Sequence, residues 1–581
     1  MATMTTEAAT AADPESVTPV LVPITIPYGY WQREASHYPQ PVSPLSRTTI
    51  TTQINRSFRL ILEESGSFLE AIDFREIGGW VYNRQVPLGG KDRKAPPPLV
   101  MKLALKFVPS LRARLKKNLQ AIRADLLWEP VGKWPAWRAE QAAQIAAFRA
   151  VGMAALEDQA FMKHFNAVTA FVDQSVERHF RLTPPGLVLA ELVFACQELL
   201  GWDQRKPFAL LTGLSTTSTE PSRRLAELAR LAAARPAVRA ALDSVDESTA
   251  GRLASIDAGF AAAFEAYQKE FGFRTLRYDV ADPALIEVPH VTLGLIRDQL
   301  RRGYDPAADA KAADEFRERA LSEARSALAG RTATERERFE RALERATTYY
   351  PIREDNEFYT VSAPLAVQRF TALELGRRLA ERSHIAVASD VFFLELAEAE
   401  RALQSEDDFR ELVRRRKGER AWVLAHPAPP SYGKDPGPPP DPNVFPAEAA
   451  TFLRATLWAI ENVFASEASQ ARQADSTRIK GIAASPGSYT GPVRVIMSEE
   501  QFDKIEAGDV LVCPITSPVW SVLFPSVGAL VTDTGGILSH PAIISREYGI
   551  PAVVATGNAT ALLKDGQVVK VDGAAGTVVA A

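Results

Sequence analysis

The segment that most constrains the fold lies near the C-terminus and predicts a strand, a turn and a helix in immediate succession. The apolar run 527–531 predicts the end of a buried strand. Residues 533–536 predict a turn, because paired glycines accept backbone angles that other residues avoid. Pro541 favours the first turn of a helix, which makes His540 the expected N-cap.

The same segment suggests what His540 could do. The helix is expected to run to about Tyr548, because Gly549 and then Pro551 end it. Free backbone N–H groups and the dipole at a helix N-terminus favour negative charge. A histidine there is well placed to carry a phosphoryl group, since its phosphoramidate is anionic. The alternative is a histidine that only caps a helix near the surface.

Several short motifs follow one another in order over most of the last domain. A Gly-Gly turn, Ser-His, a short apolar helix and Arg-Glu-Tyr-Gly-Ile-Pro-Ala-Val occupy 535–553. Further motifs stand at 481–487, 490–495, 508–512, 516–520 and 572–573. Together they resemble the phosphohistidine signature of the phosphoenolpyruvate-utilising enzymes. The resemblance implies that His540 carries the phosphoryl group, on a small domain that swivels between two active sites.

The resemblance also implies a set of phosphoryl-binding residues around the histidine: Gly535, Gly536, Ser539, Thr516 and Arg546. A structural turn is the alternative role for Thr516. At about 100° per residue, Glu547 returns to the helix face of His540, whereas Arg546 points away by roughly a third of a turn. This count favours a structural role for Arg546, as an anchor of the helix. The resemblance nevertheless keeps Arg546 as a candidate to bind the phosphoryl group.

Composition places the chain among globular proteins with more than one domain. At 581 residues about two to four domains are expected. A net charge of −4 gives no electrostatic case for nucleic acid. Cys196 and Cys513 are far apart in apolar surroundings, which predicts buried thiols in a reducing compartment. No apolar run is long enough to span a membrane, so a cytoplasmic protein without a membrane partner is expected.

The expected fold class is α plus α/β, with a large helical domain before a small one. Apolar residues at helical spacing predict helices through most of 97–280, one of which, at 187–200, is expected to be buried. A Ser/Thr-rich loop is predicted at 213–221, and its Glu220-Pro221 is expected to open the next helix. Short apolar runs separated by turns predict a small β/β/α domain at 481–581. The predicted organisation is a disordered tail at 1–22, a helical acceptor domain at 23–472 with a proline-rich strap at 426–446, a hinge at 473–480 and the swivelling domain at 481–581.

Two further segments are candidates for binding an acceptor. A tryptophan followed by His-x-Pro-x-Pro, at 31–41, resembles the opening of the substrate domain in rifampicin phosphotransferase-like proteins. A strap of extended chain over a helical core is the alternative. The second segment, at 349–359, is predicted to interrupt two charged helices and gathers aromatic rings beside an arginine and two acids.

The second segment resembles the acceptor-side site of the same family. Arg353 suits a phosphoryl group in transit, because its planar fork donates two parallel hydrogen bonds. Glu354 or Asp355 could take a proton from an acceptor hydroxyl, and the alternative is a surface ion-pair cluster. The family motif carries a lysine soon after the arginine, whereas Asn356 and Glu357 follow here.

The aromatic rings of both segments would suit an aromatic acceptor. The alternative is that these rings only pack in the hydrophobic core. His37 is also a candidate base. The predicted acceptor-binding residues are Trp31, His37, Tyr349, Tyr350 and Tyr359.

The nucleotide is expected on another polypeptide. The sequence has no GxxxxGK[ST] loop and no zinc-ligand spacing, and residues 88–91 are too short for a phosphate loop. No barrel that would bind phosphoenolpyruvate is expected after the swivelling domain, so the acceptor is expected on the helical domain. The arrangement resembles the phosphohistidine subunit of two-component aryl phosphate synthases, which implies ATP and Mg²⁺ on a separate ATP-grasp subunit.

The expected activity is a dikinase-type phosphotransfer from ATP through phospho-His540 to a small, phenolic hydroxyl, with AMP and phosphate as coproducts. Three alternatives stay open. They are an antibiotic phosphotransferase component, a condensing enzyme of secondary metabolism that releases phosphate, and a non-catalytic scaffold for an ATP-grasp partner.

Overall fold

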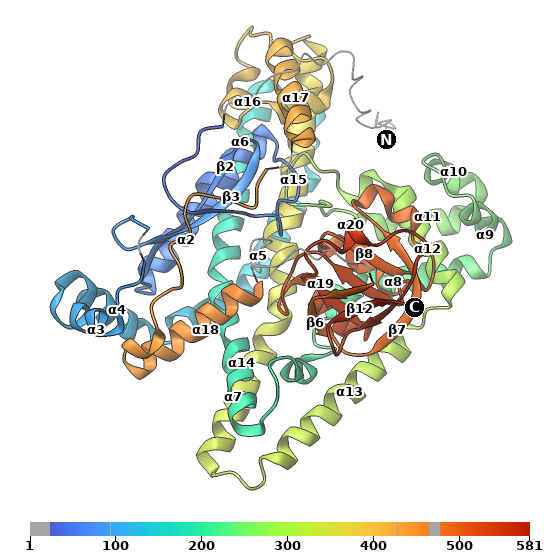
Figure 1. Ribbon diagram of the computed structural model, residues 1–581. Coiled ribbons are helices and arrows are strands. Elements are labelled where there is room, and N and C mark those ends of the chain that lie inside the picture. Colours follow the sequence, from blue (N-terminus) through green and yellow to red (C-terminus); the bar gives the residue numbers. More distant parts are fainter. Residues whose placement is uncertain (1–23, 93, 427, 464–476) are drawn as a thin grey trace. The chain divides into compact units, whose positions relative to one another are not determined.

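The computed structural model describes residues 24–92, 94–426, 428–463 and 477–581 (Figure 1). They fall into two compact units. Of the described residues, unit 1 comprises those up to residue 184 and those in 277–283 and 356–453, and unit 2 comprises those in 185–276, 284–355 and 454–581. The predicted tail at 1–22 and the first half of the predicted hinge, 473–476, lie outside the described residues.

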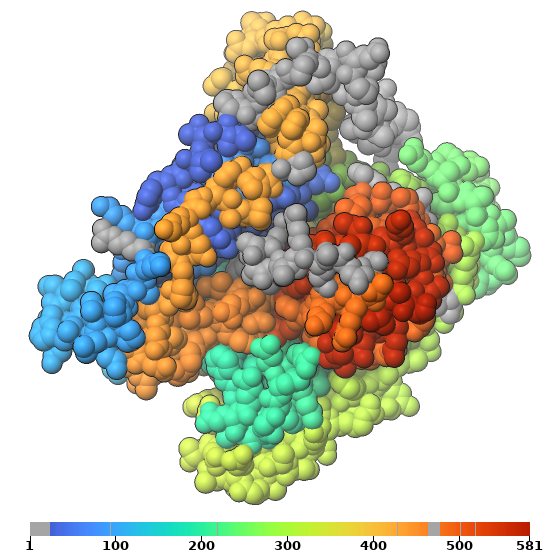
Figure 2. Space-filling view, in the orientation of Figure 1, coloured from blue at the N-terminus to red at the C-terminus, as the bar shows by residue number. Residues whose placement is uncertain are grey.

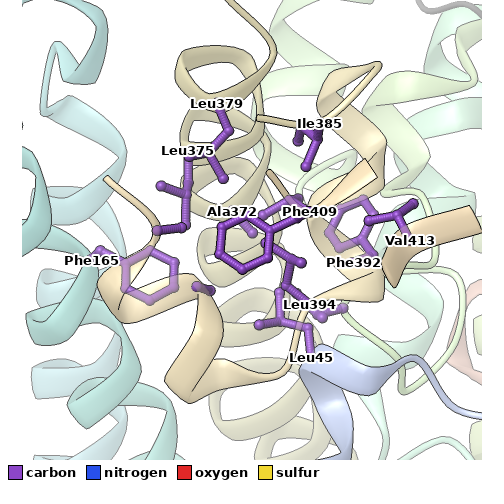
Figure 3. Close-up of a cluster of buried hydrophobic side chains, with 14 of the residues drawn as sticks. Leu45, Phe165, Ala372, Leu375, Leu379, Ile385, Phe392, Leu394, Phe409 and Val413 are labelled. Atoms are coloured by element: carbon purple, nitrogen blue, oxygen red, sulfur yellow. The ribbon is translucent and has the colours of Figure 1, made fainter. Parts of the chain in front are cut away.

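Unit 1 is a bundle of helices around one large apolar cluster. Figure 3 shows Leu375 of α15, Phe165 of α6, Phe392 and Val413 of this cluster packed together. These side chains are nearly fully buried, which gives the unit its core. The helices of the unit are α1 (Pro44–Thr49), α2 (Asn55–Glu64), α3 (Pro98–Phe107), α4 (Pro109–Arg123), α5 (Glu129–Ala150), α6 (Asp158–Arg181), α15 (Ala363–Glu381), α16 (Leu396–Ala402) and α17 (Arg410–Ala425), with the π-helices η2 (Ile50–Ile54) and η8 (Phe358–Ser362).

A four-stranded sheet in unit 1 was not predicted from the sequence. Its order is β2-β3-β1-β4, with β1 at Trp31–Arg33, β2 at Leu69–Ile77, β3 at Trp80–Pro87 and β4 at Ser431–Tyr432. Gly78 and Gly79 join β2 to β3, and both have a positive φ, as the tight turn of such a hairpin requires. Part of the proline-rich strap therefore forms an edge strand, β4, on this sheet.

The helices of unit 2 confirm the predicted helical character of this part of the chain. The predicted buried helix is present as α7 (Leu187–Leu200), which buries side chains on nearly every face. The other helices before the last domain are α8 (Thr216–Ala233), α9 (Pro236–Asp243), α10 (Thr249–Ile256), α11 (Ala258–Phe271), α12 (Pro289–Arg302) and α13 (Pro306–Ala327). Two long helices, α14 (Ala333–Glu357) and α18 (Ala447–Val463), contribute residues to both units.

The last part of the chain forms a mixed sheet of eight strands, with α19 (His540–Glu547) and α20 (Ala559–Leu562) packed on it (Figure 1). Its order is β5-β12-β11-β7-β8-β9-β10-β6, and β7 to β10 are parallel neighbours in the centre. Central strands are apolar on both faces, as buried parallel strands are. The strands are β5 (Arg478–Lys480), β6 (Ile482–Ser485), β7 (Ser488–Val495), β8 (Val510–Cys513), β9 (Ala529–Thr532), β10 (Ala552–Val554), β11 (Val568–Asp572) and β12 (Thr577–Ala580).

The predicted fold class, a large helical region followed by a small β/α domain, is confirmed. Two local predictions were wrong. The segment 349–359 does not interrupt two helices: α14 runs through Pro351 to Glu357, and η8 and α15 continue it. Helix α8 begins at Thr216, within the predicted loop, and carries Pro221 in its interior.

The domain boundaries predicted from sequence differ from the division into two units and stay predictions. Residues 478–480, in the second half of the predicted hinge, form strand β5 and pair with β12. Cys196 and Cys513 are both buried, as predicted. Burial raises the pKa of the Cys196 thiol to about 12. Within the described ranges, no helix is both long and apolar enough to cross a membrane.

Candidate active site around His540

His540 is the first residue of α19, and Ser539, not His540, is the N-cap. The reason is local geometry, since Ser539 has extended backbone angles and Pro541 occupies the second helical position. The Ser539 hydroxyl donates a hydrogen bond of 2.7 Å to the carbonyl oxygen of Gly536. This hydroxyl therefore closes the turn before the helix.

Each glycine of the turn before His540 has its own physical role. Gly535 has a φ of +112°, which disfavours residues with a side chain. At Gly536 an added Cβ would lie 2.0 Å from the backbone oxygen of Asn462, in α18. The same Asn462 oxygen accepts a hydrogen bond of 3.2 Å from the N–H of Leu538. The Gly-Gly pair therefore lets the loop turn sharply and approach α18 closely.

The imidazole of His540 lies beside a carboxylate of α14, as the two sequence motifs together imply. His540 Nδ1 is 3.5 Å from Glu354 Oε2, and the two side chains keep only 13% and 10% exposure. Arg353, the preceding residue, donates a hydrogen bond from Nη2 to the carbonyl oxygen of Leu538. Residues almost two hundred positions apart in sequence thus meet at one site within unit 2.

Asp355 faces a different partner from Glu354. Its Oδ1 accepts a hydrogen bond from the hydroxyl of Thr217, in the first turn of α8. The sequence could not separate the two acids, whereas the structure does: Glu354 lies at the histidine and Asp355 is held by Thr217. Sequence reasoning missed Thr217, because nothing in a Ser/Thr-rich segment marks one hydroxyl above its neighbours.

Arg546 anchors α19, as the helical count favoured. It is buried, and its two terminal nitrogens donate hydrogen bonds of 2.9 Å to the carbonyl oxygens of Ala484 and Ile537. Its guanidinium carbon lies 4.5 Å from the ring centre of Phe208. Burial lowers the pKa of Arg546, and Tyr350 opposes that shift.

Glu547, at the end of α19, is buried and bonded to the loop before α8. Its Oε2 accepts a hydrogen bond of 3.0 Å from the backbone N–H of Gly213. Burial raises the pKa of Glu547 to about 7, against the opposing effects of backbone hydrogen bonds and Arg546. The sequence placed Glu547 on the face of His540 but gave no sign of this buried partner.

The remaining predicted residues of unit 2 are buried near the same elements. Tyr349 and Tyr350 are almost fully buried in α14, and burial raises the pKa of Tyr349 to about 12. An added Cβ at Gly186 would lie 3.2 Å from the hydroxyl oxygen of Tyr349. The Thr516 hydroxyl is buried with no hydrogen-bond partner among the described residues.

Three of the predicted acceptor-binding residues belong to unit 1. Trp31 is core, packed with Trp80 and Tyr82 in one apolar cluster. His37 Nδ1 lies 3.0 Å from the buried carboxylate of Glu34. Tyr359 is half-buried, with the guanidinium of Arg138 4.9 Å from its ring centre.

His37 also lines a small pocket in unit 1 with Tyr278, 5.6 Å away between ring centres, and Arg277. The five predicted acceptor-binding residues therefore do not all belong to one unit. Across the part of the chain that the structure describes, no three His, Cys, Asp or Glu residues gather as metal ligands would.

Comparison with known families finds two matches. Residues 505–576 match the family described as PEP-utilising enzyme, mobile domain. Residues 184–354 match the rifampicin phosphotransferase fourth domain. These ranges contain His540 and Glu354 respectively, so each side of the site has a counterpart in the resembled family. The resemblance to the phosphoenolpyruvate-utilising enzymes is confirmed.

Three relatives illustrate the range of similarity. The uncharacterized phosphotransferase YvkC of Bacillus subtilis is 30% identical over 72% of this chain and 48% of that protein. A rifampicin phosphotransferase of a Streptomyces species is 28% identical over 73% of this chain and 48% of that protein. The phosphoenolpyruvate synthase of Aeropyrum pernix is 50% identical over 18% of this chain and 13% of its own length. The chain spans about half the length, or less, of these relatives.

Proposed function

We propose that this chain, whose residues 505–576 match the mobile domain of the phosphoenolpyruvate-utilising enzymes, is a phosphotransferase component that relays a phosphoryl group through His540. One observation carries the proposal: His540, at the start of α19, lies against Glu354 and next to Arg353 in a largely buried site. The first turn of a helix favours an anionic group, and the arginine adds a second positive charge.

In the first half-reaction an unprotonated nitrogen of His540 attacks a phosphorus atom of ATP. In the dikinase-type reaction the attack falls on the β-phosphorus, so the N–P bond forms as the P–O bond to the α-phosphate breaks and AMP leaves. Water then cleaves the remaining β–γ P–O bond, which releases phosphate and leaves one phosphoryl group on His540. We place ATP and Mg²⁺ on a separate ATP-grasp subunit.

The ring nitrogen that carries the phosphoryl group is Nε2. Nδ1 faces the Glu354 carboxylate at 3.5 Å, so a phosphoryl group on Nδ1 would meet a like charge. A carboxylate this close to Nδ1 favours the tautomer that carries its proton on Nδ1. A protonated Nδ1 makes the imidazole a better leaving group when the Nε2–P bond breaks.

In the second half-reaction the acceptor oxygen attacks phosphorus and the Nε2–P bond breaks. The Arg353 Nη2 donates to Leu538, and its remaining N–H groups are the donors that we assign to the phosphoryl oxygens. The proton of the acceptor hydroxyl goes to Asp355, whose carboxylate Thr217 holds in place. Asp355 rather than Glu354 takes this role, because Glu354 is the group at Nδ1.

The acceptor is a small hydroxyl compound, and we propose a phenol. Tyr349 and Tyr350 lie about one turn before Arg353 on α14, and we infer the aromatic acceptor from this proximity. A rifamycin-type antibiotic is the second candidate, because residues 184–354 match a domain of rifampicin phosphotransferase.

Product analysis by phosphorus NMR separates the two acceptors. The chain is incubated with ATP, Mg²⁺ and an ATP-grasp partner, and either a panel of phenols or a rifamycin is added. A stable aryl phosphate is the expected result. If the rifamycin were phosphorylated and the phenols stayed unreacted, the acceptor would be the antibiotic and not a phenol.

A further inference from the structure

Helix α3 of unit 1 carries a stripe of large apolar side chains on its outer face. Leu99, Val100, Leu103 and Phe107 keep 70, 51, 49 and 68% of their surface exposed. At about 100° per residue the four fall within roughly 100° of the helix circumference. With Val108, they account for five of the thirteen exposed large apolar side chains in the described parts of the chain. Such clustering marks an interaction site more often than scattered exposure does.

The stripe belongs to a helix that is already packed. Met101 and Leu105, on another face of α3, are buried in a cluster with Val444, Phe445 and neighbouring residues of α4 and α18. The apolar stripe is therefore additional to the apolar face that holds α3 in unit 1. In the space-filling view the atoms of α3 and α4 (light blue) lie exposed at the surface (Figure 2).

The hairpin formed by α3 and α4 is strongly basic, although the whole chain is slightly acidic. Between Lys94 and Arg123 the sequence contains eight lysines and arginines and no acidic residue. Arg114 and Lys117 pair with Glu63, and Arg123 pairs with Glu448.

The other basic side chains of the two helices stay without such a partner. Among the described residues no carboxylate pairs with Lys102, Lys106, Arg112 or Lys116, all of which are exposed. Each helix thus presents two unpaired cations four positions apart, one pair on α3 and one on α4.

Two of these lysines border an open groove beside the stripe. The groove has a volume of about 350 Å³, and its wall includes Lys102, Lys106, Leu115 and Phe445. The lysines lie at neighbouring positions on one edge of α3, adjacent to Leu99 and Leu103 on the helical wheel. The α3 surface therefore places apolar side chains that could insert into an apolar phase next to lysines that could bind anions.

We propose that the α3–α4 hairpin docks on a membrane surface that contains anionic lipids. Leu99, Leu103 and Phe107 insert among the acyl chains, and Lys102 and Lys106 bind lipid phosphates at the groove. A basic helix with an apolar stripe has the composition of interfacial helices that lie in the membrane plane. This mode needs no membrane-spanning segment, and it does not depend on the phosphotransferase proposal.

Other occupants fit the hairpin less well. A second copy of the same surface would bring like charges together. A protein partner of ordinary affinity needs about 800 Å² on each side, more than a stripe of one ten-residue helix provides. Insertion of a few side chains, assisted by lysines, requires no such area.

Vesicle sedimentation tests the proposal with the full chain. Vesicles of phosphatidylcholine with a third phosphatidylglycerol are compared with vesicles of phosphatidylcholine alone, at low and high salt. The expected result is binding to the anionic vesicles that is at least about tenfold tighter and that weakens with salt. The double variants Leu103→Gln/Phe107→Gln and Lys102→Glu/Lys106→Glu should each lose about tenfold in binding.

Matched variants outside the hairpin serve as controls. Val568→Gln replaces an apolar side chain of similar exposure, and Lys564→Glu/Lys570→Glu reverses two exposed lysines of the last domain. Both should bind vesicles like the unaltered chain. Binding to neither vesicle type, or equal losses in hairpin and control variants, would overturn the proposal. So would a dimer in light scattering that only the hairpin variants dissociate, since the stripe would then be a contact between copies.

Discussion

Glu354 and Asp355 are neighbours in the sequence, and their side chains have different partners in the structure. Glu354 lies at Nδ1 of His540, and Asp355 is bonded to Thr217 at the start of α8. Helical geometry explains the difference, because consecutive residues of a helix point about 100° apart. In the proposed mechanism one carboxylate therefore orients the imidazole, and the other accepts the proton of the acceptor.

Replacing each acid should affect a different property of the second half-reaction. Glu354→Gln should slow transfer from phospho-His540 by about a hundredfold for every acceptor, because Nδ1 loses its carboxylate. Asp355→Asn should slow transfer to alcohols by a similar factor but transfer to acidic phenols much less, because those need little base assistance. Rapid-quench single turnovers of the phosphorylated chain measure both.

Glu344→Gln, an exposed change on the same helix, is the matched control and should leave both rates unchanged. Loading of His540 from ATP should be normal in all three variants. If Glu354→Gln slowed the loading of His540 from ATP as much as it slowed transfer to the acceptor, the division of roles between the two acids would be contradicted.

The pKa of Glu547 makes stability depend on pH. Its pKa is raised by burial from 4.5 to about 7 in the folded chain, so the folded state binds the proton more tightly. The stabilising contribution is complete below pH 4.5 and is lost as the pH rises through about 7. This contribution is on the order of 3 kcal/mol, because each pKa unit corresponds to about 1.4 kcal/mol.

Glu547→Gln cannot ionise, so its free energy of unfolding should vary less between pH 5 and pH 8 than that of the unaltered chain. Denaturant titrations at both pH values measure this difference. An identical pH dependence in the two proteins would show that the Glu547 carboxyl is not protonated in the folded state.

At the scale of elements, the contact between the His540 loop and α18 depends on a missing side chain. A Cβ at Gly536 would lie 2.0 Å from the Asn462 backbone oxygen, which cannot move without α18. Gly536→Ala should therefore lower the free energy of unfolding by about 1–3 kcal/mol and disturb His540.

Gly132→Ala in α5 is the contrasting variant, since an added Cβ there meets nothing within 4 Å. It should be neutral or stabilise the chain by up to about 1 kcal/mol. Thermal unfolding compares the two. If Gly536→Ala is as stable as Gly132→Ala, the close approach of loop and helix is not present in solution.

The elements of the last domain could be predicted because short apolar runs and glycine turns specify them locally. The strand before His540, the turn and α19 all lie within a few residues of their predicted places. The β2–β3 hairpin was missed, although Gly78-Gly79 between apolar runs is a hairpin signal. Pro221 suggested a helix start, and the segment 349–359 suggested an interruption between two helices. The packing of α8 and α14 overrides these local preferences, so both helices carry a proline in their interior.

The site itself could be predicted only in part. Its histidine and the Arg-Glu pair carry family motifs, whereas their partners Thr217 and Asn462 come from distant segments without any motif. Which of two adjacent acids faces the histidine depends on the rotation of α14, and no local pattern determines that. Long-range contacts of this kind require the three-dimensional structure.

At the scale of the whole molecule, the central claim is that His540 carries a phosphoryl group between two sites. The claim explains why a strand-turn-helix junction, an arginine and a carboxylate meet at one largely buried place. It also requires a second site that binds ATP, which we place on a separate ATP-grasp subunit.

The most direct test is the intact mass of the chain after incubation with ATP and Mg²⁺, with and without an ATP-grasp partner. The account predicts one acid-labile phosphate that appears only with the partner, maps to His540 and is absent from His540→Ala. Glu344→Gln should be loaded normally and serves as the control. An adduct of the same size on His540→Ala, or none on the unaltered chain with a partner shown to bind it and cleave ATP, would contradict the phosphohistidine relay.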